Sequence, residues 1–359
     1  MLIYYLFFLA IFFLSFLEIN IEKKVELRIV FWVIAGVLVI MAALRYKTGF
    51  DIDAYRAIFD FVDYSNFSES LIEPGSFLVI VLIHTLGLNF QFYLFSYALV
   101  AVLLKFRFFA QYSPYLFLSA LIYFPIGFLI NELGQIRHGL AIGIVLIAFG
   151  YLFQNKTKWF FIYSTLAIFF HLSAFIVLPV YFFVNRNIKS AYLILSIYIL
   201  SGLLFIDSRP FLLSILDYVP IPAIQSKMTL YLYSEEFGSP LGFNFSFVLR
   251  FIIFIVLVYF KEPGEQKFFF YKKLIWLYYY GILLYIVFNS VSDFAIRTSV
   301  YFKTLDCLIL PCIITLGKTR KEKVVLWSIF VLYAFYSLYK LLSDPATAKA
   351  FIPYRTIFS

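Results

Sequence analysis

Residues 28–55 read RIVFWVIAGVLVIMAALRYKTGFDIDAY, an apolar run that ends in a charged, glycine-containing segment. The run from 28 to 44 approaches the length of about 20 apolar residues that a helix needs to cross a bilayer. Charge and glycine gathered at the end of such a run are costly unless they bind something. This stretch therefore predicts a membrane helix with a candidate functional segment at its aqueous end.

The rest of the chain has a similar composition. Hydrophobic residues make up 64% of the 359 residues and charged residues only 14%, whereas a soluble domain is just under half apolar and about a quarter charged. The mean hydropathy is +0.93. Basic residues give a net charge of +9 but are spread through short loops, as positive-inside orientation and anionic lipid would produce. The composition predicts a membrane protein and gives no sign of nucleic-acid binding.

Apolar runs recur from Leu2 to Leu342 and predict eleven to thirteen membrane crossings in a single all-α membrane domain, residues 1–359. The predicted spans are 2–20, 28–44, 90–108, 115–130, 138–153, 190–206, 243–260, 274–290, 297–316 and 324–342. Three shorter runs are 76–88, 159–170 and 174–184, and the last two are either two short helices or one broken helix. The first run lacks a basic leader and a small-residue cleavage site, so we interpret it as a retained helix.

Basic segments between the runs predict which loops face the cytoplasm. These segments are Lys105/Arg107, Lys156/Lys158, Arg186/Lys189, Lys261 to Lys273 and Lys318 to Lys323. The opposite, outer face then carries residues 45–75, 131–137, His171 to Ala174, 207–242, 291–296 and the tail after Leu342. The run 76–88 disturbs this alternation, so we interpret it as re-entrant, which is allowed where backbone is buried in protein. The alternative places the N-terminus and residues 45–75 in the cytoplasm.

Four polar groups stand out against this background, and on the favoured topology all four share the outer face. The first runs from Arg45 to Tyr55 and continues to Glu73-Pro74. Arg45 closes a span and could bind a phosphate or a carboxylate through two hydrogen bonds. Asp51 and Asp53 could accept a proton or hold a cation. The alternative is a solvated loop whose arginine extends to the interface.

The second group is the segment NELGQIRHG at 131–139, between two apolar runs. Arg137 stands at the start of the next predicted helix, and a helix N-terminus together with an arginine is a ready anion site. Glu132, Gln135 and His138 lie in the same short segment. The alternative is an ordinary turn with charged residues at the interface.

The third group is His171, which interrupts an apolar stretch with no other charge nearby in sequence. Histidine can serve as a general base near neutral pH, although a lone histidine is more often packed and bonded to backbone. The fourth group holds Asp293 and Arg297, four residues apart, which is the spacing of a helical ion pair and is also compatible with a ligand contact. The two cysteines, Cys307 and Cys312, are interpreted as packing residues.

In their order along the chain, these groups resemble the motifs of bacterial polysaccharide polymerases of the Wzy and EpsG type. The matching residues are Arg45-Tyr46, Gly49-Phe50-Asp51, Tyr55, Glu73-Pro74, Ile136 to Ala141, His171 to Ala174, Arg297, Tyr301-Phe302 and Pro353-Tyr354-Arg355. The chain departs from the family pattern at His138, where Gln is usual. Zinc-ligand spacing, a P-loop, G-x-S-x-G and a dinucleotide motif are absent from the sequence, so it predicts neither a metal nor a cofactor.

The resemblance implies a membrane glycosyltransferase whose helical bundle is similar to the GT-C class. Such proteins act at the outer face of the bacterial inner membrane on oligosaccharide repeat units linked to undecaprenyl diphosphate. They transfer the growing chain from its lipid carrier onto the non-reducing end of the next unit and release the lipid diphosphate. The product is an O-antigen, capsule or secreted exopolysaccharide. Expected partners are membrane lipid, a chain-length regulator and a flippase.

Under this resemblance the charged residues take specific roles. A diphosphate leaving group needs positive charge as it departs, and Arg137, Arg45 and Arg297 are the candidates. His171 is the first candidate for the base that deprotonates the acceptor hydroxyl, and Asp51 is the second. The remaining candidates for contact with substrate are Tyr55, Glu73, Asp53, Glu132, Gln135, His138 and Tyr301.

Two other functions are compatible with the sequence. A ligase that attaches finished polysaccharide to a lipid acceptor would use much the same chemistry. A flippase for lipid-linked oligosaccharide, or another transporter, would also be polytopic and basic. A transporter is expected to place charged residues inside helices and to show two related halves, whereas this sequence gathers its charges at the ends of apolar runs.

Overall fold

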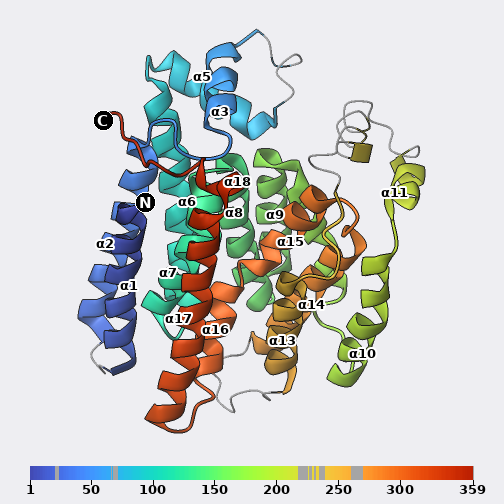
Figure 1. Cartoon of the computed structure of the whole chain (residues 1–359). Helices are drawn as coiled ribbons and strands as arrows, with labels where there is room; N and C mark the ends of the chain where they lie inside the picture. The colour runs from blue at the N-terminus through green and yellow to red at the C-terminus, as the bar shows by residue number, and fades with distance from the viewer. Residues whose placement is uncertain are drawn as a thin grey trace. The chain divides into compact units, whose positions relative to one another are not determined.

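The computed structural model describes residues 1–20, 24–65, 67, 72–216, 225, 229, 232–233, 239–259 and 270–358. These residues are mainly helical, and their one β-type pairing is an isolated bridge between Arg45 and Thr356. The chain, whose helices are labelled in Figure 1, divides into two compact units by its internal contacts. Unit 1 holds Met1–Phe175 and Asp306–Ser359, and unit 2 holds Ile176–Leu305. The prediction of a single membrane domain stays a prediction.

Among the described residues, unit 1 contains nine helical segments from the first part of the chain and three from the last part. They are α1 (Leu2–Asn20), α2 (Lys24–Leu44), α3 (Ile52–Phe61), α5 (Pro74–Thr85), α6 (Phe90–Tyr112), α7 (Leu116–Tyr123), the π-helical η1 (Phe124–Glu132), α8 (Ile136–Phe153), α9 (Thr157–Phe170), α16 (Asp306–Ile314), α17 (Arg320–Ser343) and α18 (Pro345–Ala348). Side-chain caps begin two of the long helices. Asn89 accepts hydrogen bonds from the Gln91 and Phe92 amides at the start of α6, and Thr319 accepts one from Glu322 at the start of α17.

Unit 2 is built from shorter segments. They are α10 (Ser190–Leu200), η3 (Ser201–Phe205), α11 (Arg209–Leu216), α13 (Phe245–Tyr259), α14 (Tyr271–Val287) and α15 (Ser292–Lys303), together with most of the 3₁₀ segment η2 (Leu172–Phe182). Polar side chains join segments that are distant in sequence. Ser208 donates its backbone amide to Ser290 Oγ at 2.8 Å, and the Asn289 amide donates to the Leu204 carbonyl at 3.1 Å.

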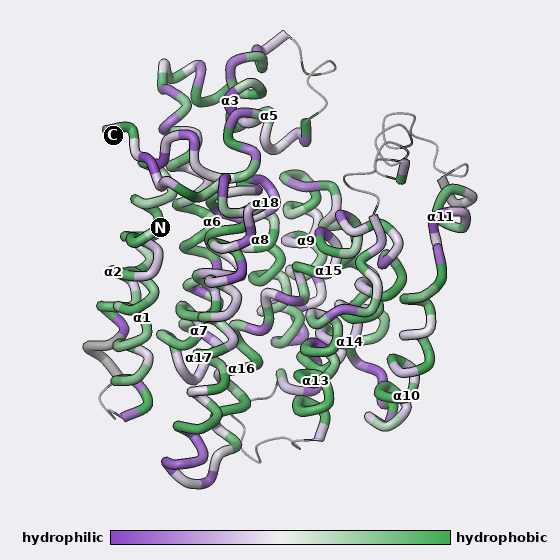
Figure 2. Tube along the Cα trace, viewed as in Figure 1, coloured by the Kyte–Doolittle hydropathy of each residue, from purple (hydrophilic) through white to green (hydrophobic). Residues whose placement is uncertain are grey.

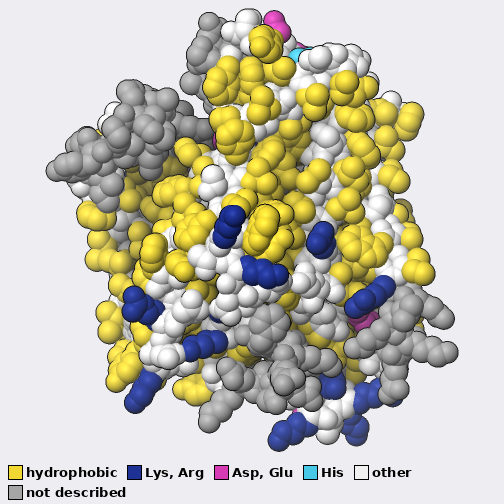
Figure 3. All heavy atoms as spheres, turned by 180° about the vertical axis from the view of Figure 1, so that it is seen from behind, with side chains coloured by type: hydrophobic (Ala, Val, Ile, Leu, Met, Phe, Trp, Pro, Cys, Tyr) yellow, Lys and Arg dark blue, Asp and Glu magenta, His cyan; other side chains and the backbone are white. Residues whose placement is uncertain are grey.

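The fold is an all-α membrane fold, as the sequence predicts. Among the described residues, α1, α6, α8 and α17 are long and apolar enough to cross a bilayer, and seven further apolar helices have 10–17 residues. Figure 2 colours α1 and α2 mainly hydrophobic, with hydrophilic residues gathered at the turn before α17. The face drawn in Figure 3 is largely hydrophobic, and Lys and Arg side chains form small separate groups on it. This pattern suits helices whose outer surfaces meet lipid.

Four segments predicted to share one face meet at one end of unit 1. The Gly49 amide donates to the Ala350 carbonyl at 2.7 Å, so the loop after α2 lies against the C-terminal tail. Glu73 pairs with Arg137, which brings the start of α5 to the start of α8. His171, at the end of α9, stacks on His138. The membrane face that this end meets stays a prediction.

The short run 76–88 forms α5, which starts and finishes near this same end. Its first turn follows Glu73, and the chain then returns to Gln91, whose side-chain amide donates to the Ala43 and Arg45 carbonyls at 2.7 and 2.8 Å. In Figure 1, α3 and α5 lie together. A 12-residue helix is about 18 Å long, well short of the roughly 30 Å hydrocarbon core. The re-entrant path of this short helix stays a prediction.

Two details differ from the sequence predictions. Lys105, which we assigned to a cytoplasmic loop, lies inside α6. Its buried charge is tolerated there because it pairs with the buried carboxylate of Glu132 from η1. The predicted span 297–316 is two helices, α15 and α16, separated at Thr304 and Leu305. The second helix, α16, begins at Asp306, which is buried and accepts a hydrogen bond from the Tyr333 hydroxyl at 3.2 Å.

Candidate functional site

Arg137 occupies the first turn of α8, where the helix leaves backbone amides without helical partners. The Arg137 guanidinium forms an ion pair with Glu73, the residue that precedes α5. The same guanidinium stands 5.6 Å from the centre of the Tyr55 ring on α3. The two charged side chains are 18% and 11% exposed. The site therefore combines a positive helix end, an arginine and a carboxylate, and it is largely screened from water.

Tyrosines from α3 and α6 surround this arginine. Tyr55, Tyr93 and Tyr97 are all buried, and the Tyr97 hydroxyl donates to Ser76 Oγ at 2.9 Å. Tyr55 and Tyr93 lie within electrostatic range of both Arg137 and Arg45. The two arginines therefore share one buried cluster, although Arg45 comes from the end of α2.

Arg45 is only 1% exposed and has few partners. Its Nη1 donates to the Ala42 carbonyl at 2.5 Å, while its Nε and Nη2 are buried without a hydrogen-bond partner. Burial lowers the pKa of the Arg45 guanidinium to about 10, because removal from water disfavours the charged form. None of the ion pairs among the described residues includes Arg45. A buried cation in this state is stabilised by any anion that reaches it.

Two histidines stack beside the cluster. The rings of His138, on α8, and His171, which caps the end of α9, have centroids 4.4 Å apart at 18°. His138 Nδ1 lies 3.3 Å from Gln135 Oε1, and His171 Nδ1 lies 2.7 Å from Ser173 Oγ. Each ring is thus held through Nδ1 by a neighbour in its own segment.

A buried ion pair holds the turn that carries Gln135, Arg137 and His138. Lys105, fully buried on α6, pairs with Glu132 before the turn and donates to the Gly139 carbonyl after it, at 2.6 Å. The approach is close enough that a Cβ on Gly139 would lie 3.1 Å from Glu132 Oε1. In the structure Glu132 pairs with Lys105, and the contact with substrate that the sequence suggested for Glu132 stays a prediction.

The loop after α2 presses against the same turn. Gly49 has a φ of +112°, and a Cβ built on it would lie 1.6 Å from the Leu133 carbonyl oxygen. Asp51 is partly buried at the N-cap of α3 and its carbonyl accepts from the Tyr55 amide at 2.9 Å, while Asp53 is exposed in the first turn. Among the described residues, no group of three or more His, Cys, Asp or Glu side chains is arranged to hold a metal ion.

A family model matches residues 28–356, which takes in every segment of this cluster. The chain belongs to the EpsG family. The EpsG family consists of polysaccharide polymerase-like proteins, so the resemblance read from the sequence is confirmed. No curated protein and no solved structure matches the chain.

Three residues that carry the resemblance to EpsG-type polymerases, Arg297, Tyr301 and Phe302, lie in unit 2. Arg297 pairs with Asp293 at 3.0 Å on α15, as their spacing in sequence predicts, and the two side chains are 26% and 21% exposed. Tyr301, on the same helix, is fully buried. The Asp293 carboxylate therefore already engages the charge of Arg297.

Sequence reasoning missed several residues of this EpsG-family chain. Tyr93, Tyr97 and Ser76 gave no signal, because tyrosine and serine are ordinary within its apolar runs. Lys105 and Arg250 did give one, since each is a charge inside a mainly apolar helix, Lys105 together with Arg107 in α6 and Arg250 alone in α13. An ionisable residue in such a position is a functional candidate by default.

Proposed function

We propose that this EpsG-family protein polymerises oligosaccharide repeat units carried on undecaprenyl diphosphate in the bacterial inner membrane, with its reactive end facing outward. The carbon–oxygen bond between the donor sugar and the diphosphate breaks, and the leaving diphosphate takes the electron pair. An acceptor hydroxyl forms the new glycosidic bond and gives its proton to a base. The product is a surface polysaccharide, and a flippase and a chain-length regulator are the expected partners.

The observation that carries this proposal is the pairing of Arg137 with a carboxylate at the start of α8. Glu73 occupies a position suited to an anion at a helix N-terminus, and the buried Arg45 lies within electrostatic range of the same tyrosines as Arg137. Backbone amides and guanidinium groups that are fixed in place stabilise charge as it develops on a leaving diphosphate. The Nε and Nη2 of Arg45 have no partner and suit further phosphate oxygens.

The base is assigned to His171. Its Nδ1 lies 2.7 Å from Ser173 Oγ, a contact that fixes the ring, and Nε2 is then the atom that takes the proton. The stacked His138 ring limits its movement on one side. Tyr55 and Gln135 remain the proposed contacts to sugar hydroxyls, with Asp51 and Asp53 at the rim of the same loop.

A transporter of lipid-linked oligosaccharide is the second candidate. The Lys105–Glu132 pair supports it, because charged groups buried inside membrane helices are common in transporters. A polymerase accounts for the same pair as a support of the α8 turn. A test of the proposed function must therefore measure bond formation and lipid movement separately.

The deciding experiment is a product-length assay. Purified protein is incubated with the undecaprenyl-diphosphate-linked repeat unit of its host, and the glycan is resolved on a gel. We expect a ladder of whole repeats, reduced about a hundredfold or more in Arg137→Ala because one fixed donor to the leaving group is lost. Arg107→Ala is the matched control, since Arg107 is exposed on α6 and should leave the ladder intact.

Two results would decide against the polymerase. Absence of a ladder, with the substrate crossing the bilayer of proteoliposomes instead, would identify a transporter. A single addition to a lipid acceptor without repeats would identify a ligase. A full ladder from Arg137→Ala would keep the polymerase and remove Arg137 from the diphosphate site.

A further inference from the structure

Arg250 is a buried charge within unit 2, apart from the residues assigned to the proposed function. It is the sixth residue of the apolar helix α13, FSFVLRFIIFIVLVY, and is only 8% exposed. Placing a guanidinium in such a helix is costly unless something compensates its charge. The identity of that compensating group is therefore a question about function.

Among the described residues, the hydrogen bond and the ring contact of Arg250 are to neutral groups. Its Nη1 donates to Ser299 Oγ on α15 at 3.0 Å, and its guanidinium stands 4.5 Å from the centre of the Tyr285 ring on α14. The Tyr285 hydroxyl in turn accepts a hydrogen bond from the Asn244 side-chain amide at 2.7 Å. The Nε of Arg250 is buried and has no hydrogen-bond partner. Among the described residues, no carboxylate forms an ion pair with it.

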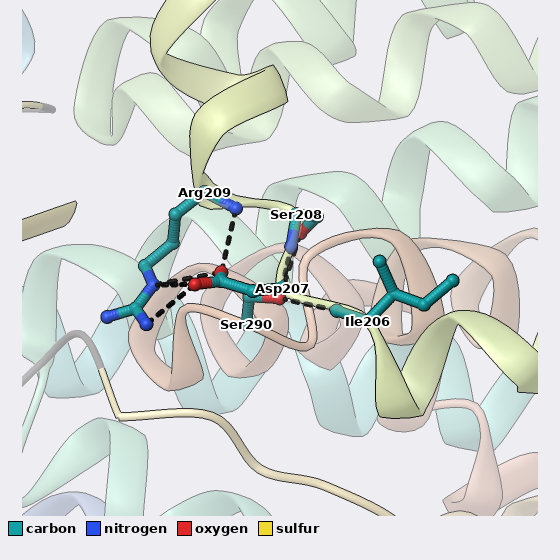
Figure 4. A network of polar contacts seen from close by, with 5 residues as sticks. All are labelled: Ile206, Asp207, Ser208, Arg209 and Ser290. Atoms are coloured by element: carbon teal, nitrogen blue, oxygen red, sulfur yellow. Dashed lines mark hydrogen bonds and ion pairs between the residues drawn. The ribbon is translucent and has the colours of Figure 1, made fainter.

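Two other arginines of unit 2 are arranged differently. Arg209 binds both carboxylate oxygens of Asp207 at 2.7 to 2.9 Å, as Figure 4 shows, and these hydrogen bonds hold the pKa of Asp207 below its usual value. Arg297 pairs with Asp293 at 3.0 Å. Both pairs are far more exposed than Arg250. Among the described residues, the unit thus pairs Arg209 and Arg297 with carboxylates and leaves the more deeply buried Arg250 without an ion pair.

We propose that Arg250 binds the phosphate of a lipid head group. A guanidinium offers a planar fork of N–H donors that matches phosphate oxygens, and the unpartnered Nε belongs to that fork. Arg250 lies about 8 Å along α13 from its first residue, a depth that a head group at the membrane surface can reach. Basic pockets between membrane helices bind phosphate head groups in this way. Tyr285 stacks on the guanidinium and keeps it in place.

The phosphate can come from a phospholipid or from a polyprenyl diphosphate carrier, and binding measurements separate the two. Full-length protein is purified in a non-ionic detergent, and its affinity is measured for phosphatidylglycerol, farnesyl diphosphate and zwitterionic phosphatidylcholine. Wild-type protein, Arg250→Met and Arg209→Met are compared. We expect Arg250→Met to weaken binding of one anionic lipid about tenfold or more, because a charge-assisted pair is lost. Arg209→Met, whose arginine is exposed and paired, should bind as wild type does.

The melting temperature without lipid distinguishes a binding site from a structural contact. Replacing an uncompensated buried charge by an apolar side chain of similar length is neutral or stabilising. We therefore expect Arg250→Met to melt no lower than wild type in detergent alone and to lose the rise in Tm that the anionic lipid gives wild type.

Three outcomes would overturn the proposal. One is a lower Tm for Arg250→Met without lipid together with an unchanged lipid-induced rise, which would mean that Arg250 only joins α13 to α14 and α15. Another is equal loss of binding in Arg209→Met, which would mean nonspecific charge attraction. The third is binding of neither anionic lipid by wild-type protein. Because these measurements do not require sugar transfer, they stand or fall separately from the polymerase assay.

Discussion

At the scale of single residues, the candidate site depends on two glycines that let neighbouring segments of the backbone pack closely together. Gly49 brings the loop after α2 against the Leu133 carbonyl, and Gly139 allows Glu132 to approach the first turn of α8. Gly49 and Gly139 of the family motifs thus stand where a side chain would crowd neighbouring atoms, and Arg137 stands where its charge pairs with Glu73. His138 departs from the family pattern, and it stacks on the proposed base.

Gly49→Ala should destabilise the protein by about 2 kcal/mol or more, because an L side chain is strained at a φ of +112° and its Cβ would overlap the Leu133 carbonyl. The measurement is the Tm of the purified protein in detergent. Gly36→Ala is the matched control, since no atom lies within 4 Å of the added Cβ and alanine favours the helix. Equal effects of the two substitutions would contradict the role given to Gly49.

The two histidines make separable predictions. His138→Gln restores the residue that is usual in the family and should keep the product ladder, since it leaves His171 in place. His171→Gln should abolish the ladder, because an amide cannot accept the proton. The same gel assay measures both. A reversed result, with transfer lost only in His138→Gln, would make His138 the base.

At the scale of elements, the π-helical end of η1 and the start of α8 are held by a third helix. Lys105 on α6 contacts the chain on both sides of the intervening turn, through Glu132 and Gly139. Burying two charges is costly, and their mutual attraction and the added hydrogen bond offset that cost. An ion pair between α6 and η1, which the sequence did not predict, therefore fixes the turn that precedes Arg137.

Breaking this pair on one side should cost about 3–5 kcal/mol, because the remaining charge is left buried and alone. Lys105→Met and Glu132→Gln should each lower the Tm strongly, and the double variant should be more stable than either single one. Thermal unfolding of all four proteins in the same detergent provides the double-mutant cycle. Losses that simply add would show that the two side chains do not depend on each other.

At the scale of the whole molecule, the C-terminal tail closes unit 1 at the end that bears the site. The Tyr46 amide donates to the Arg355 carbonyl, the Tyr4 hydroxyl to the Phe351 carbonyl and the Tyr354 hydroxyl to the Met41 carbonyl, all at 2.7 to 2.9 Å. These bonds join α1, α2 and the loop after α2. The tail therefore positions the segment that carries Arg45.

Deleting residues 350–359 should lower the Tm by several degrees and reduce sugar transfer, because buried hydrogen bonds lose one partner each. Deleting only residues 358–359 is the control, since the Phe358 side chain is 81% exposed. Both variants are measured by thermal unfolding and by the product-length assay. An active, stable protein after the longer deletion would contradict this role for the tail.

The sequence by itself determined that this chain is an all-α membrane protein of the EpsG family. Hydropathy is a local property, and lipid forces each apolar run to satisfy its backbone within a helix. The order of short motifs then identified the family, and the spacing of Asp293 and Arg297 indicated the ion pair that they form as one of two alternatives. These features require no knowledge of which helices are neighbours.

Only the tertiary structure decided which of the candidate residues meet. Glu73 and Arg137 are 64 positions apart, Lys105 and Glu132 are 27 apart, and the stacked histidines belong to different helices. Such contacts depend on helix packing and on the path of α5, which no local pattern encodes. The same reason explains why Lys105 was assigned to a loop, since Glu132, the partner that makes its buried charge tolerable, is distant in sequence.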